Sequence, residues 1–168
     1  FVLRPVAARN GFVERLANLW ANRLTVGVVG NAGLLIEPFR AEVARAHLAG
    51  RFEDMLRASL WHPAMQVYLD QKRSIGPKSN LGLRKGLGLN ENLAREYLEL
   101  FTLGHGNYTE ADVTAAARAL TGFTLQRDGG TAVARLRPRR HDSGQKTLLG
   151  RSGDLGADDV VDLALAQP

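Results

Sequence analysis

Cysteine is absent from this 168-residue chain, and its absence excludes disulfides, cysteine-based zinc sites and a thiol nucleophile. No apolar run is long enough to cross a membrane, which takes about 20 residues as a helix. Serines are few, and none lies in the context of a nucleophile elbow. The spaced glycines Gly27, Gly30 and Gly33 lack the Lys-Ser/Thr pair of a phosphate-binding loop. The sequence therefore contains no established catalytic motif.

Composition indicates a folded domain with a basic surface. A hydrophobic fraction of 45% and a charged fraction of 23% are ordinary for globular proteins, and 168 residues are enough to bury a core. The formal net charge is +5, but basic residues are scattered except in the cluster at residues 135–140. Such scatter is more typical of an Arg-rich composition than of a nucleic-acid-binding surface. Because the chain starts at Phe1 and stops at Pro168, directly after a helical pattern, we expect a fragment of a longer domain.

Apolar residues at helical spacing predict a mainly α fold for residues 1–168, with the helices packed as an orthogonal multi-helix array in a single domain. A small β-hairpin is expected in the C-terminal third. Residues 71–89, rich in Gly, Ser, Lys, Pro and Asn, are predicted to form a long exposed basic loop. The predicted helices span residues 12–24, 34–48, 51–61, 64–69, 91–103, 110–121 and 158–166.

The clearest pattern is a pair of amphipathic helices at residues 91–103 and 110–121, joined by a Gly-rich turn. Thr109 precedes the second helix, and Asp112 follows three residues later, which is the spacing of a capping box. Alanines along the second helix allow another helix to approach closely. The residues expected in the buried face of the pair are Tyr97, Phe101, Val113 and Leu120.

The chain changes character after Gly122. Two short β-like runs flank an Asp-Gly-Gly turn at residues 128–130, and this arrangement favours a hairpin. Residues 123–149 are therefore predicted to form a β-hairpin followed by an Arg-rich loop. One further short strand is expected at residues 147–149.

Six segments of the chain carry one recognisable signature. They are GRFEDMLRASLWHPAMQVYLD (50–70), NENLARE (90–96), LFTLG (100–104), NYTEADV (107–113), ALTGF (119–123) and RPRRHDSGQKTLLG (137–150). Together they resemble the bacterial family catalogued as domain of unknown function 1800. The resemblance implies export from the cytoplasm, since members often carry export signals, and it assigns no reaction.

The chain departs from the family pattern at one point near its start. Members often carry a Trp-x-Asn-His run, commonly with another His between Trp and Asn. Trp20 and Asn22 are present, but Ala21 and Arg23 replace the histidines. If those histidines help to build a metal or acid–base site, this chain has lost part of it.

The polar face of the first amphipathic helix is one candidate site. Its carboxylates Glu96 and Glu99 could bind a divalent cation or act as acid and base, with Asn92 and Arg95 positioning a substrate. A solvated polar face explains the same pattern, as does a structural network in which Asn90 or Asn92 caps a neighbouring backbone. The residues alone favour a solvated face, whereas the resemblance, whose signature includes these positions, brings the interpretations close to parity.

His141 and Asp142 form the second candidate site. A histidine supplies a base or metal ligand near neutral pH, and an aspartate can orient it, but neighbouring residues on a strand point to opposite faces. With Arg139, Arg140 and Lys146, the same segment could instead recognise phosphate, sulfate or carboxylate groups. An exposed structural loop is the simplest interpretation of the segment.

Three functional hypotheses follow. The leading one is an extracytoplasmic helical domain that binds a partner protein or an anionic polymer through residues 135–146. The second is a metal-assisted hydrolase that uses Glu96, Glu99, His141 and Asp142 as ligands or acid–base groups. Nucleic-acid binding ranks lowest, because no recognised nucleic-acid module is present. Neither a cofactor nor an oligomeric state follows from the sequence.

Overall fold

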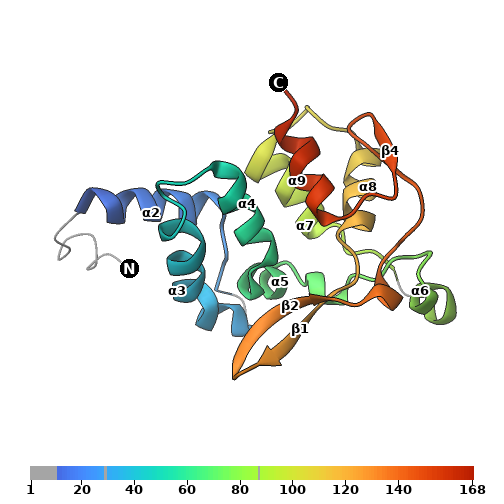
Figure 1. Ribbon diagram of the computed structural model, residues 1–168, viewed down its shortest axis with the longest axis horizontal. Helices are drawn as coiled ribbons and strands as arrows, with labels where there is room; N and C mark the ends of the chain where they lie inside the picture. The colour runs from blue at the N-terminus through green and yellow to red at the C-terminus, as the bar shows by residue number, and fades with distance from the viewer. Residues whose placement is uncertain (1–10, 29, 87) are drawn as a thin grey trace.

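The computed structural model describes residues 11–28, 30–86 and 88–168, and it is mainly α-helical (Figure 1). The α-helices are α2 (Gly11–Arg23), α3 (Ile36–Phe39), α4 (Phe52–Trp61), α5 (Pro63–Tyr68), α6 (Asn80–Lys85), α7 (Asn92–Glu96), α8 (Glu110–Ala119) and α9 (Ala157–Leu165). The shorter 3₁₀ or π segments are η1 (Gly30–Leu35), η2 (Arg40–Arg45), η3 (Gln71–Arg73), η4 (Tyr97–Thr102) and η5 (Pro138–Arg140). Within the described ranges, no helix has the length and apolar character needed to span a membrane.

The helices form two groups joined through the middle of the molecule. Figure 1 shows α2 and α3 at one end, α4 and α5 in the centre, and α7, α8 and α9 at the other end. α4 contacts both η2 and α9, so its apolar face links the two groups. That face buries Met55, Leu56 and Leu60, each at most 3% exposed. One apolar core therefore runs through both groups.

The predicted helix at residues 34–48 is less regular than its sequence pattern indicates. The chain there passes from η1 through α3 into η2, a π segment that ends at Arg45. Pro38 lies within α3 and has no N–H to donate to the preceding turn. The expectation of one continuous α-helix is therefore wrong for this segment, although its apolar residues Phe39 and Val43 are buried.

The predicted central pair of helices is confirmed, with one change of helix type. Its first member is α7 followed by the π segment η4, whose bonding continues from the Leu103 N–H to the Leu98 carbonyl at 2.9 Å. α8 begins at a capping box in which Thr109 and Asp112 bond to each other's backbone N–H groups. The four residues expected in the buried face, Tyr97, Phe101, Val113 and Leu120, are at most 3% exposed.

The prediction of a long exposed loop at residues 71–89 is wrong for much of that segment. The segment contains η3 and α6. Gln71 Nε2 donates to the Leu120 carbonyl at 2.7 Å, and Ser79 Oγ caps α6 by accepting the Gly82 N–H at 3.0 Å. Gln71, Ser74, Ile75 and Ser79 are all buried. Serine and glycine in this segment cap a helix and allow close packing. Composition alone does not distinguish these roles from the same residues in an exposed loop.

Two antiparallel β-hairpins follow α8. β1 (Phe123–Asp128) pairs with β2 (Thr131–Leu136), which confirms the predicted hairpin and its Gly-Gly turn. β3 (Lys146–Leu148) pairs with β4 (Arg151–Gly153) and packs against α8. The first hairpin contacts α5 and η3 and lies beneath α5, at the lower edge of the view in Figure 1. In this position β1 and β2 contribute residues to the walls of two cavities.

Candidate functional site

Arg95, expected to position a substrate, makes ion pairs between the two central helices. Its Nη1 and Nη2 donate to Glu110 Oε1 and Oε2 at 2.8 and 2.7 Å, and Nη2 lies 3.7 Å from Glu91 Oε2. The hydrogen bond from Arg95 lowers the pKa of the Glu110 carboxyl. This two-pronged pair joins α7 to the first turn of α8, so Arg95 serves a contact within the fold.

Glu96 and Glu99 are close enough for their charges to interact. Partial burial raises the pKa of Glu96, and the neighbouring Glu99 carboxylate raises it further. Glu99 Oε2 accepts a hydrogen bond from the Tyr108 hydroxyl at 2.8 Å, and Oε1 lies 3.7 Å from His105 Nδ1. A raised carboxyl pKa is compatible with acid–base chemistry. However, the part of the chain that the structure describes has no group of three His, Asp or Glu side chains arranged to hold a metal ion.

Asn90 belongs to a structural network at the start of α7. Its Nδ2 donates to the Leu69 carbonyl at 2.8 Å, and its Oδ1 accepts the Asn92 N–H at 2.9 Å. The Asn90 N–H donates to Ser74 Oγ at 3.1 Å. The Asn92 side chain is exposed. Of the interpretations that the sequence leaves open for Asn90, the geometry supports backbone capping.

Asp142 is completely buried and connects three parts of the chain. Its Oδ1 accepts from Arg118 Nη2 at 2.9 Å and from the Gly144 N–H at 3.2 Å. Its Oδ2 accepts the Lys78 N–H at 3.3 Å, and its own N–H donates to Thr121 Oγ1 at 2.9 Å. Burial acts to raise the pKa of Asp142, but the hydrogen bonds, that of Arg118 foremost, lower it below its ordinary value. The carboxylate is thus engaged as a structural anchor.

The His141 ring does not share the hydrogen-bond partners of the Asp142 carboxylate and has a defined tautomer. Its Nδ1 lies 3.0 Å from the Thr121 carbonyl oxygen, which can only accept, so the neutral ring carries its proton on Nδ1. This leaves Nε2 with a lone pair. The ring lies on the wall of a cavity beside β1, β2 and the start of α9. The structure therefore separates the roles of the two neighbours, because Asp142 serves the fold and His141 faces a cavity.

Lys146 and Arg140 contribute less to an exposed basic patch than the sequence predicts. Lys146 is 2% exposed, and its Nζ lies 3.1 Å from Asp154 Oδ1. Arg140 is half-buried; its Nη2 donates to the Lys72 carbonyl at 2.7 Å, and burial lowers the pKa of its guanidinium. The expectation that Lys146 belongs to an exposed anion-binding patch is therefore wrong.

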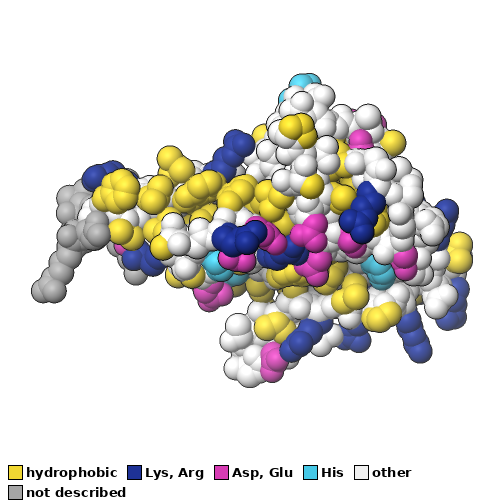
Figure 2. Space-filling model, turned by 45° about the horizontal axis from the view of Figure 1, so that its top comes forward, with side chains coloured by type: hydrophobic (Ala, Val, Ile, Leu, Met, Phe, Trp, Pro, Cys, Tyr) yellow, Lys and Arg dark blue, Asp and Glu magenta, His cyan; other side chains and the backbone are white. Residues whose placement is uncertain are grey.

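The exposed arginines Arg84, Arg137 and Arg139 form what we call the basic surface, where α6 meets η5. Arg84 and Arg139 make no ion pair with a carboxylate in the described residues. Figure 2 shows Lys and Arg side chains gathered near the end of the molecule that holds α6. An open cavity of about 470 Å³ is lined by Asn80, Leu83, Arg84 and Arg139, and one of about 370 Å³ by Arg137, Pro138 and Arg139. Sequence reasoning found Arg139 but missed Arg84, which it assigned to the loop.

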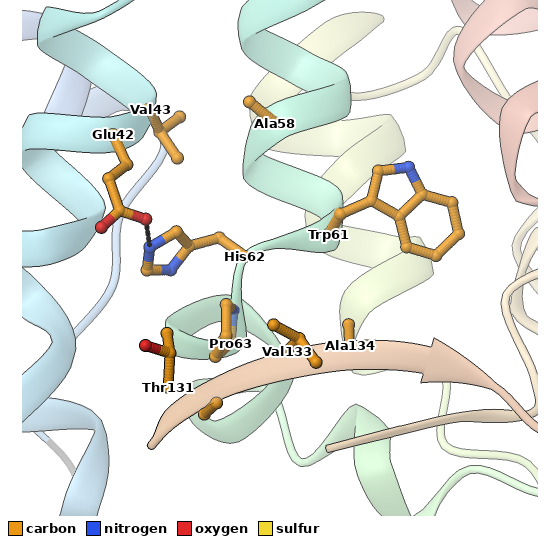
Figure 3. Close-up of a pocket in the computed structure, with 10 residues that line it drawn as sticks. Glu42, Val43, Ala58, Trp61, His62, Pro63, Thr131, Val133 and Ala134 are labelled. Carbon is orange, nitrogen blue, oxygen red and sulfur yellow. Dashed lines mark ion pairs between the residues drawn. The ribbon is translucent and has the colours of Figure 1, made fainter. Parts of the chain in front are cut away.

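A different cavity, of about 350 Å³, lies between η2, the end of α4 and β2 (Figure 3). Its walls are largely apolar. Figure 3 shows Glu42 reaching from η2 toward the His62 ring, with the indole of Trp61 on the far side of the cavity. The apolar walls include Val43, Ala58, Trp61, Pro63, Val133 and Ala134.

His62 in this cavity has both ring nitrogens occupied. Its Nδ1 accepts the Ala64 N–H at 3.1 Å and so caps α5, which confirms the predicted helix boundary. The proton of the neutral ring is then on Nε2, 3.3 Å from Glu42 Oε2. Burial lowers the pKa of His62, although Glu42 opposes this effect. With no free lone pair, His62 stabilises the fold and is not a ready general base.

The positions at which the family pattern has histidines lie on α2. Ala21 and Asn22 line a small cavity of about 60 Å³ together with Arg40, which is 2% exposed. Arg40 Nη2 lies 3.9 Å from Glu14 Oε2. Neither Ala21 nor the exposed Arg23 can supply an imidazole. A histidine-based site therefore does not form on this helix.

A comparison with models of known families identifies the family of this chain. A family model described as "Protein of unknown function (DUF1800)" matches residues 1–168, the whole of the chain. No curated protein and no solved structure matches it.

Proposed function

The chain belongs to the DUF1800 family, whose description names no reaction, and we propose that it binds an anionic polymer through the basic surface. The observation that carries this proposal is the pair of exposed guanidinium groups of Arg84 and Arg139 on one open cavity of about 470 Å³. No carboxylate among the described residues pairs with either group. Exposed arginines without internal partners keep their forked donors for sulfate, phosphate or carboxylate groups.

The backbone beneath the basic surface is held in place, which favours binding. The Arg140 carbonyl accepts the Gly76 N–H at 2.8 Å, and Asp142 accepts the Lys78 N–H at 3.3 Å. Both bonds join the segment that leads into α6 to the segment of η5. The arginines therefore project from two connected elements, and little backbone freedom is lost when a ligand bridges them.

The chemistry of the lining favours an acidic polysaccharide or polyacid over single-stranded nucleic acid. Proteins that bind single strands combine positive charge with aromatic side chains on which bases stack. The described side chains that line the two cavities of the basic surface include no aromatic residue. Charge recognition without stacking suits a polymer whose anionic groups are its main feature.

The test is binding of heparin as a model polyanion, measured by fluorescence anisotropy of a labelled oligomer at low salt. The double variant Arg84→Gln/Arg139→Gln should bind at least about tenfold more weakly, because each charge-assisted hydrogen bond contributes about 1.5 kcal/mol or more. The matched control is Arg127→Gln/Arg151→Gln, which removes two exposed arginines outside the basic surface. Equal losses in both variants would show that only net charge matters and would contradict the proposal. Tighter binding of single-stranded DNA than of heparin would favour the nucleic-acid alternative.

A further inference from the structure

Another cavity, of about 350 Å³, lies between the first hairpin, the end of α4 and the start of α9. The side chains that matter to its chemistry are Trp61, Phe123, Leu136, His141, Asp158 and Asp159. The charged side chains of this cavity are acidic, whereas those of the basic surface are arginines. No arginine or lysine among the described residues lines this cavity, whereas two carboxylates do.

The His141 ring is fixed in orientation on the wall of this cavity. Its Nδ1–H donates to the Thr121 carbonyl, which leaves the Nε2 lone pair as an acceptor; none of the described groups donates to it. Gly122 packs directly against the residue, since a Cβ at this position would lie 2.9 Å from His141 Cβ. A histidine anchored through one nitrogen presents the other at a constant place, as binding sites require.

Within the described part of the chain, each of the two aspartates has one carboxylate oxygen engaged. Asp158 Oδ1 accepts from Arg57 Nη1 at 2.8 Å, and Asp159 Oδ2 accepts the Gly156 N–H at 2.8 Å. The remaining oxygens add two acceptors to the His141 Nε2 lone pair. A ligand that satisfies these groups must donate hydrogen bonds and is favoured if it is positively charged.

The apolar part of the cavity is aromatic. Trp61 and Phe123 lie with ring centroids 4.2 Å apart, and Leu136 of β2 adds an aliphatic surface. Aromatic faces attract cations and bury apolar groups. The carboxylates and the aromatic rings therefore both favour a ligand that carries a cationic group and an apolar body.

We infer that this cavity binds a primary amine with an apolar body. The ammonium group lies between His141 Nε2 and the aspartates, and the apolar body lies against Trp61 and Phe123. This site is separate from the basic surface and does not depend on the proposed function. Nothing in the family description assigns it.

The probe for this site is 2-phenylethylamine, compared with the neutral analogue 2-phenylethanol. The chain has two tryptophans, so a Trp20→Phe background leaves Trp61 as the fluorescence reporter. The amine should quench or shift Trp61 emission with saturation, at a Kd on the order of 1 mM for a fragment of this size. The alcohol should bind at least about tenfold more weakly, because it lacks the charge. Equal binding of amine and alcohol, or no saturable response to the amine, would overturn the inference.

Matched variants place the binding at this cavity. Asp158 and Asp162 both pair with Arg57, but only Asp158 lines the cavity. Asp158→Asn should weaken amine binding about fivefold or more, whereas Asp162→Asn should leave it unchanged. Loss of binding in both variants, or in neither, would contradict the assignment. Because these aspartates are exposed, both variants are expected to fold, and thermal melting verifies this.

A second control separates this cavity from the neighbouring one in Figure 3, which shares Trp61. Glu42 lines the neighbouring cavity and is not among the residues that line this one, so Glu42→Gln should leave the amine affinity unchanged. A large loss in Glu42→Gln would move the amine to the other cavity and overturn the inference. In addition, NMR of the imidazole nitrogens should show a shift of His141 Nε2 on addition of the amine but none of His105, which is exposed elsewhere.

Discussion

At the scale of single residues, the same side-chain chemistry takes different roles according to burial. Asp142 and His141 are adjacent and read alike as acid–base candidates. The structure buries Asp142 against Arg118, whereas His141 lines a cavity and donates through Nδ1 to the Thr121 carbonyl. Lys146 is likewise withdrawn by its contact with Asp154, whereas Arg139 is exposed. Residue type alone therefore identifies candidates but does not distinguish anchors from binding groups.

The anchor role of Asp142 predicts a large loss of stability in Asp142→Asn. Removing one partner of a buried ion pair leaves the Arg118 charge uncompensated, and we expect a loss of about 2–3 kcal/mol in the free energy of unfolding, measured by urea denaturation. The control is Asp128→Asn, which breaks the exposed pair with Arg135 and should cost less than about 1 kcal/mol. Comparable losses in the two variants would contradict the anchor role.

The pH dependence of the Asp142 contribution has a definite sign. Because the pKa of Asp142 is lower in the folded than in the unfolded chain, its stabilisation is fully present above about pH 4. It is lost as the pH falls through the folded pKa. In urea denaturation at several pH values, the difference between the original chain and Asp142→Asn should therefore shrink below about pH 4.

At the scale of elements, the short connections between helices and strands determine where the cavities form. Gly122 connects α8 to β1 with a φ of +93°, and a Cβ added to it would lie 2.9 Å from His141 Cβ. His62 and Pro63 connect α4 to α5 in the same short way, next to the cavity of Figure 3. A short connection of this kind sets the direction of the next helix or strand, and thus the shape of the cavity beside it.

The connection at Gly122 predicts that Gly122→Ala destabilises the fold more than an alanine substitution at another glycine with positive φ. Gly122→Ala places a Cβ in the left-handed backbone region and within 2.9 Å of His141 Cβ. We expect a loss of about 3 kcal/mol in the free energy of unfolding, since strain and steric overlap both contribute. Gly130→Ala is the matched control, because Gly130 has a φ of +86° but nothing within 4 Å of the added carbon. It should lose only about 1 kcal/mol; an equal loss at both sites would show that the contact with His141 is unimportant.

At the scale of the whole molecule, charge is separated between two sites. The basic surface lies where α6 meets η5, and the cavity with Asp158 and Asp159 lies at the start of α9. A net charge of +5 is thus distributed unevenly, which gives each site its own ligand preference.

This separation predicts different responses to salt. Heparin binding by the basic surface should weaken by roughly tenfold to a hundredfold between about 50 and 200 mM salt, because a few arginine contacts release counterions. In Arg84→Gln/Arg139→Gln the slope of log K against log salt should fall by about two. Amine binding in the other cavity should change much less over the same range, since it involves one small cation. Equal slopes in the original chain and the double variant would contradict the assignment of the basic surface.

Much of the fold could be predicted from local patterns. Helical periodicity, the Thr109–Asp112 capping box and the Gly-Gly turn each depend on residues a few positions apart, and all three are present. The loop predicted at residues 71–89 failed because Gln71 and Ser79 are satisfied by contacts that composition does not show. The prediction of η4 as ordinary α-helix failed because a single π turn inside a helix differs by its i→i+5 hydrogen bonds, which the apolar pattern does not report.

The sequence by itself determined the helical class, the hairpin, the family and the identity of the candidate groups, because these depend on neighbouring residues. Only the tertiary structure decided which of those groups meet. Arg118 reaches Asp142, Glu42 reaches His62, and Arg84 shares a cavity with Arg139 across long stretches of chain. Such pairings depend on how the packed helices orient distant segments and on which charges burial can tolerate. For that reason the candidate sites of this protein are properties of the packing, although every residue in them is visible in the sequence.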